Sequence, residues 1–202
     1  MSLQSYLQPE MSVWLVLALA ILLAVRNHRF WPGALAVSLS IALLFGVIDW
    51  IGVGTVILGC GAALLARYVS GWYALILQIF VVVWAVALAA HLLPGFHNLK
   101  VLDQVITGEA SAPFSMNFNL DKPMLIFAFL LLLPGMLKKH PQGDAVKKSG
   151  LAALILLSLL SVAWSVGLIE PELSVPDWIL LFAFNNLLMT SVAEEVFFRG
   201  YL

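Results

Sequence analysis

Two adjacent carboxylates, Glu194 and Glu195, lie near the end of the chain in an otherwise apolar stretch. A charge at the centre of a bilayer costs about 2.5–3.5 kcal/mol on insertion scales, so an acid in such a stretch usually has a function. Glu194 follows Trp178 by about 24 Å of helix axis, at ~1.5 Å per residue. Glu194 is therefore expected toward the end of its membrane segment, where this cost is smaller.

Helical spacing gives the two acids different neighbours. Residues four apart stack on one helix face, so Arg199 can hold Glu195 as an ion pair. Glu194 has Phe197 and Phe198 at the corresponding positions and no cation one turn away. A carboxylate in apolar surroundings accepts a proton more readily than one in water, as a general base near neutral pH requires. The spacing thus predicts one braced acid and one reactive acid.

A structural interpretation of the same residues stays open. Two glutamates followed by an arginine can form a solvated cap at the membrane interface, stabilised by one ion pair along the helix. Acids near the C-terminal end of a helix oppose its dipole, which favours cations there. This opposition favours a functional role for the acids.

The composition shows which elements position these acids. Apolar residues make up 62% of the 202 residues, charged residues 10%, and the mean hydropathy is +1.02. Soluble domains have about 25% charged residues, so a soluble globule is excluded and the bilayer is the expected partner. A net charge of −1 gives no basic excess for nucleic acid.

Seven apolar segments approach the length of a membrane span, which is about 20 residues for a hydrocarbon core ~30 Å thick. They are 11–25, 30–48, 50–66, 72–93, 123–137, 150–168 and 178–198. We predict an all-α polytopic membrane protein with about seven transmembrane helices. Residues 1–177 carry the first six, and residues 178–202 form the helix with the acidic pair.

Basic residues predict the orientation of these segments. Seven of them fall in alternate connections, namely Arg26, Arg29, Arg67, Lys138, Lys139, Lys147 and Lys148, whereas only Lys100 and Lys122 fall in the others. The positive-inside rule then places the N-terminus outside and the end of the seventh helix at the cytoplasmic face.

The remaining polar and aromatic residues predict packing or anchoring. Thr55, Gly59 and Ala63 form a stripe of small residues that lets helix backbones approach closely. Tryptophans near the predicted span ends are expected as interfacial anchors, among them Trp14. No histidine is assigned a catalytic role. His91 and His97 are expected outside, a membrane away from Glu194, and His28 and His140 are expected in basic cytoplasmic loops.

Residues 194–202, Glu-Glu-Val-Phe-Phe-Arg-Gly-Tyr-Leu, resemble the first motif of the CAAX protease and bacteriocin-processing (CPBP) family, Glu-Glu-x-x-x-Arg-Gly-x-Leu. These intramembrane endopeptidases include the Ras-converting enzymes. The resemblance covers only the end of the chain, and the six upstream helices suit a bacterial inner-membrane member with an N-terminal extension.

The resemblance implies a glutamate-dependent protease. Glu194 would deprotonate the water that attacks the scissile carbonyl, and Glu195 and Arg199 would shape the site. The substrate would be a prenylated C-terminus, a secreted peptide precursor or a C-terminal sorting tail. No cofactor is expected, and zinc is the alternative. The family also has Phe-x-x-x-His and His-x-x-x-Asn or Asp motifs on later helices, so the chain is expected to be an N-terminal fragment, inactive alone.

Two other classes of function stay open. One is a non-catalytic bacteriocin-immunity or scaffold protein of the same family. The other is a proton-coupled transporter in which Glu194 is a relay carboxylate. Carriers often contain internal repeats and broken helices, and neither is detected in the sequence.

Overall fold

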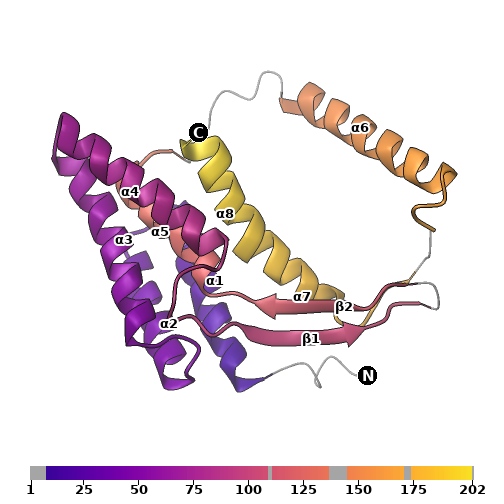
Figure 1. Ribbon diagram of the computed structural model, residues 1–202, viewed down its shortest axis with the longest axis horizontal. Coiled ribbons are helices and arrows are strands. Elements are labelled where there is room, and N and C mark those ends of the chain that lie inside the picture. The colour runs from indigo at the N-terminus through magenta and orange to yellow at the C-terminus, as the bar shows by residue number, and fades with distance from the viewer. Residues whose placement is uncertain (1–7, 109–110, 137–144, 171–173, 202) are drawn as a thin grey trace.

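The computed structural model describes residues 8–108, 111–136, 145–170 and 174–201, and these are mostly helical (Figure 1). The elements in chain order are η2 (Pro9–Met11), α1 (Ser12–Val25), α2 (Trp31–Leu44), α3 (Trp50–Tyr68), α4 (Trp72–Ala89), β1 (Leu99–Val105), β2 (Phe114–Phe118), α5 (Asp121–Leu132), α6 (Ala145–Ser165), α7 (Ile179–Phe184), η3 (Asn185–Ser191), α8 (Val192–Glu195) and η4 (Val196–Tyr201). The last four form one helical run, 179–201, which carries Glu194 and Glu195 and which we call the motif helix.

Three helices of the described part are long and apolar enough to cross a membrane: α3, α4 and the run Ile179–Phe198. The apolar helices at 9–25, 31–44 and 150–165 are shorter. The predicted span 123–137 differs most, because α5 has only 12 residues and most of them are buried within the protein. At ~1.5 Å per residue, α5 is about 18 Å long and too short to cross ~30 Å of hydrocarbon.

Helices α3 and α4 pack through the predicted stripe of small residues. A side chain at Gly59 would overlap the ring of Trp84, and Ala63 is fully buried. The Trp84 indole Nε1 donates a hydrogen bond to the carbonyl of Thr55 at 3.2 Å. The stripe thus brings α4 onto α3, which confirms its predicted role in packing.

An antiparallel hairpin of β1 and β2 lies in the connection between α4 and α5. It pairs Leu99 with Phe118 and Val105 with Phe114, with irregular register between them. This hairpin was not predicted and corrects the all-α assignment. Leu102 and Phe118 are buried, so one side of the hairpin belongs to the core.

Helix α5 lies in the interior, in contact with α1, α3, α4 and the motif helix. Ile126, Phe127 and Phe129 on α5 are fully buried. Trp14 of α1 is also fully buried and packs edge-on against Phe118 at 5.5 Å between ring centroids. The expectation that Trp14 is an interfacial anchor is therefore wrong.

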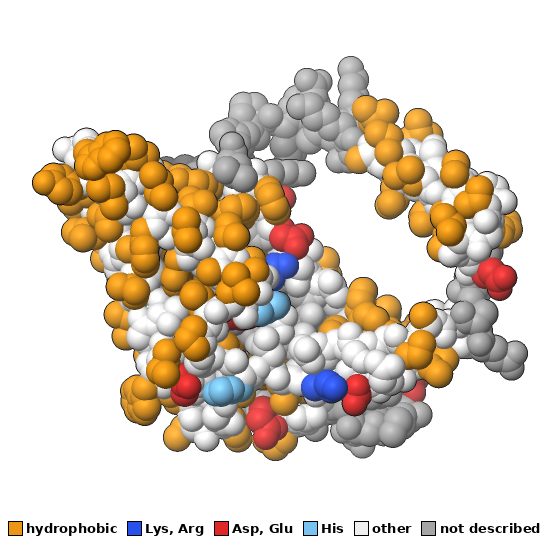
Figure 2. Space-filling view, viewed as in Figure 1, with side chains coloured by type: hydrophobic (Ala, Val, Ile, Leu, Met, Phe, Trp, Pro, Cys, Tyr) orange, Lys and Arg blue, Asp and Glu red, His pale blue; other side chains and the backbone are white. Residues whose placement is uncertain are grey.

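Helix α6 lies apart from the other helices in Figure 1. Its described side chains, 150–165, are almost all exposed, including Leu154, Leu157 and Trp164. Figure 2 shows apolar side chains over α6 and also over the outer surface of α3 and α4. Exposed apolar surface of this extent is typical of contact with lipid or another protein.

Candidate functional site

An ion pair between distant parts of the chain lies at the centre of the candidate site. Lys122 on the first turn of α5 places its Nζ 2.9 Å from Oε1 of Glu194 on α8. The Lys122 side chain is 22% exposed and that of Glu194 is 50% exposed. Glu194 has no cation one turn away on its own helix, but it is paired, because α5 supplies Lys122.

The ion pair lies at an apolar cavity of about 300 Å³. Helix α4 contributes Ala85, Val86 and Ala89, α5 contributes Leu125, and the motif helix contributes Ala193, Phe197 and Phe198. Lys122 and Glu194 supply the charged part of the lining. A carboxylate and an ammonium group thus lie side by side in the lining of an apolar cavity.

Local sequence explains the position of Lys122. Asp121 begins α5 and Pro123 follows within the first turn, where an acid and a proline are both favoured. Oδ1 of Asp121 accepts a hydrogen bond from the backbone N–H of Lys122 at 2.8 Å. Leu120 is fully buried and anchors the chain just before the helix. The backbone is therefore held in place just before Lys122.

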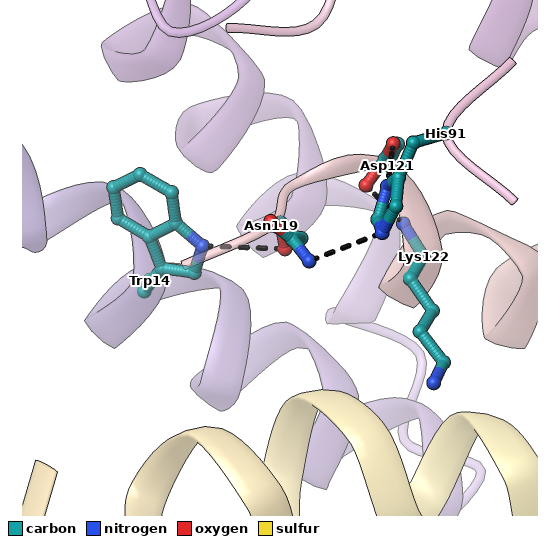
Figure 3. A network of polar contacts seen from close by, with 5 residues as sticks. All are labelled: Trp14, His91, Asn119, Asp121 and Lys122. Atoms are coloured by element: carbon teal, nitrogen blue, oxygen red, sulfur yellow. Dashed lines mark hydrogen bonds and ion pairs between the residues drawn. The ribbon is translucent and has the colours of Figure 1, made fainter. Parts of the chain in front are cut away.

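A second polar group adjoins Lys122, as Figure 3 shows. His91 Nδ1 lies 2.6 Å from Oδ2 of Asp121, whose side chain is 3% exposed. The Nδ2 of Asn119 lies 3.3 Å from Nε2 of His91, and the carbonyl of Asn119 accepts a hydrogen bond from Trp14 Nε1 at 3.4 Å. Because a carboxylate accepts hydrogen bonds and does not donate them, Nδ1 of His91 is the donor to Asp121.

The position of His91 corrects the sequence-based prediction. His91 was expected a membrane away from Glu194, but it bonds Asp121, the chain neighbour of the lysine that pairs with Glu194. His91 follows α4 with a φ of 57°, a left-handed conformation common just after helix ends. The last turn of α4 thus lies beside Glu194. His97 lies elsewhere, 3.8 Å from Asp49, His28 is in the exposed turn before α2, and His140 is outside the described residues.

The motif helix departs from α-helical geometry on both sides of the acids. Segments η3 and η4 are π-helical, with hydrogen bonds five residues apart. π-helical segments are rare in proteins, and those that occur are often at functional sites. The side-chain rows expected from a spacing of four residues therefore do not extend through 185–201. Asn186 instead bonds the carbonyl of Phe182 at 2.9 Å through its side-chain amide.

Aromatic contacts hold the end of the motif helix against α5. Phe197 and Tyr201 pack on Phe129, with ring centroids 5.6 and 4.9 Å apart. A Cβ at Gly200 would lie 2.6 Å from the terminal methyl of Met136, which would have to shift. Glu195 is exposed and has a partner. The side chain of Arg199 is outside the described residues, so the predicted pair between Glu195 and Arg199 stays a prediction.

Sequence reasoning missed Lys122, Asp121 and His91 as neighbours of Glu194. A usable signal was present, since Lys122 and Glu194 are opposite charges in apolar surroundings, each without a partner on its own helix. Among the described residues, no three His, Cys, Asp or Glu side chains lie close enough together to hold a metal ion. Comparisons with protein-family models, with curated proteins and with solved structures found no match to the chain.

Proposed function

We propose that the chain carries the general base of a CPBP-type intramembrane endopeptidase and that Glu194 is this base. The observation that carries the proposal is the position of Glu194, which lies with Lys122 in the lining of an apolar cavity of about 300 Å³. Binding sites are typically apolar, ~300–1,000 Å³ in volume, with a few polar groups that orient the reacting part. This cavity has room for an apolar side chain of a peptide whose backbone passes the carboxylate.

The proposed reaction hydrolyses one peptide bond of a membrane-associated protein or peptide. Glu194 takes a proton from water, and the water oxygen attacks the carbonyl carbon. The protonated carboxyl then gives the proton to the leaving nitrogen, and the C–N bond breaks to yield an acid and an amine. Glu195 and Arg199 are proposed to shape the site from the same helix, and no cofactor is assigned.

We further propose a multi-pass protein of a bacterial inner membrane that cleaves a secreted peptide precursor, a C-terminal sorting tail or a prenylated C-terminus. The positive-inside count that placed the N-terminus outside treated 123–137 as a span, and α5 is too short to cross the membrane, so the orientation stays a prediction.

The test compares new protein N-termini in membranes that contain the complete gene product or its Glu194→Gln variant. This substitution keeps the shape and removes the base, so we expect one set of cleavages to disappear, by at least about 100-fold as is typical for a general base. Glu170→Gln is the matched control, because Glu170 lines a different cavity beside Trp178. Equal cleavage by wild type and Glu194→Gln, with equal amounts in the membrane, would contradict the proposal.

One observation supports a proton-coupled carrier as a second candidate. Four ionisable side chains, His91, Asp121, Lys122 and Glu194, come from three segments and adjoin one another through contacts of 2.6 and 2.9 Å and a peptide bond. Linked ionisable groups among apolar helices are typical of proton pathways. Proton uptake by proteoliposomes that Glu194→Gln abolishes, without any peptide cleavage, would favour this candidate.

A further inference from the structure

The ammonium of Lys122 lines the same cavity as the proposed base. From this geometry we infer that Lys122 is a second catalytic residue, which stabilises the oxyanion formed when water attacks the scissile carbonyl. The inference rests on the proposed function of Glu194 and extends it to a residue 72 positions away in the sequence.

The movement of charge during the reaction carries the inference. Before attack, the negative charge is on Glu194, with the ammonium 2.9 Å away. When the carboxylate takes the proton of the attacking water, it becomes neutral and the negative charge appears on the carbonyl oxygen. A lysine ammonium has three N–H donors, and the bond to Glu194 uses one. The same cation can therefore follow the charge over a short distance, from the carboxylate to the oxyanion.

The surroundings of Lys122 suit this role. Preorganised donors in a site with little water stabilise a developing charge far more than donors in solution. The Lys122 side chain is largely shielded, at 22% exposed, and apolar residues form most of the cavity wall. Lys122 also lies in the first turn of a 12-residue helix, whose dipole adds positive potential.

The neighbouring acid does not compete for the ammonium. Asp121 directs Oδ2 to His91 and Oδ1 to the backbone N–H of Lys122. Its carboxylate therefore fixes the backbone of Lys122 and leaves the side chain turned toward the motif helix, as Figure 3 shows. Lys100 offers a contrast, because it pairs locally with Asp103 at 3.2 Å and both side chains are more than half exposed.

The experiment measures cleavage by the complete gene product in membranes, using as substrate the peptide whose cleavage depends most strongly on Glu194. Lys122→Met is compared with Lys122→Arg and with the control Lys100→Met. We expect Lys122→Met to lower kcat by about 100- to 1,000-fold, as loss of an oxyanion donor does. KM should change by less than about threefold, because the contact between Lys122 and the oxyanion forms only in the transition state. Lys122→Arg should recover part of the rate, and Lys100→Met all of it.

A phosphinate analogue of the same peptide separates catalysis from positioning. Its tetrahedral anion resembles the oxyanion and needs no base, so Lys122→Met should weaken its binding by roughly the factor lost from kcat/KM. Unchanged phosphinate affinity with a reduced kcat would overturn the inference and make Lys122 a positioning residue for Glu194. Normal kcat in Lys122→Met would also overturn it while the proposed function stands, whereas normal cleavage by Glu194→Gln would refute the proposed function itself.

Discussion

Two parts of the molecule are assembled by different physical means. The first is the pair of helices α3 and α4, and the second is the group formed by α5 and the motif helix. In the first pair, neighbours in sequence pack through small residues, with Gly59 against Trp84. In the second group, aromatic packing on Phe129 is joined by a lysine and a glutamate that lie 72 positions apart in the sequence and meet at 2.9 Å. The comparison teaches that packing between adjacent helices follows from local pattern, whereas a polar site depends on partners that the pattern does not identify.

The largest loss of stability is expected from a substitution between α3 and α4. Gly59→Leu would place side-chain atoms within the ring of Trp84, so we expect a loss of about 3 kcal/mol in the free energy of unfolding, the upper end for overpacking. Gly61→Leu on the same helix is the control, because nothing lies within 4 Å of a Cβ there. Unfolding in detergent micelles measures both, and equal stabilities would contradict the close packing of α3 and α4.

A smaller loss of stability is expected from a substitution at the start of α5. Asp121→Asn keeps the shape of a buried side chain but replaces the carboxylate that accepts from His91 at 2.6 Å. Hydrogen bonds to charged groups contribute about 1.5–3 kcal/mol, so we expect a loss of about that size. Asp103→Asn, at a side chain that is 62% exposed, should change stability by less than about 0.5 kcal/mol. Similar small losses in both variants would show that the contact between His91 and Asp121 contributes little to stability.

The sequence predicted features that depend on neighbouring residues. The stripe at Thr55, Gly59 and Ala63 follows from the local spacing of small residues, and its role in packing is confirmed. The hairpin of β1 and β2 was not predicted because its strands are short and irregular in register. The segment at 123–137 looked like a span because apolar content alone does not distinguish burial in protein from burial in lipid.

The candidate site could be predicted only in part. Glu194 was identified from its apolar setting, and it does line an apolar cavity. Its partner Lys122 was not identified, because one helical periodicity describes one helix and carries no information about which other helix lies beside it. Assigning sides of the membrane by charge also separated His91 from Glu194, although the end of α4 and the motif helix line the same cavity.

Cross-linking tests the meeting of α5 and the motif helix most directly. In a Cys60→Ala background, the Lys122→Cys/Glu194→Cys double variant is treated in membranes with a short bifunctional thiol reagent, and a protease site introduced between 145 and 170 reports whether the two halves stay joined. The account predicts efficient joining for this pair and none for Lys100→Cys/Glu194→Cys, since Lys100 lies on β1 and does not line the cavity that Lys122 and Glu194 share. Separation of the halves in the first variant, with both thiols accessible to the reagent, would contradict the assembly of the site from Lys122 and Glu194.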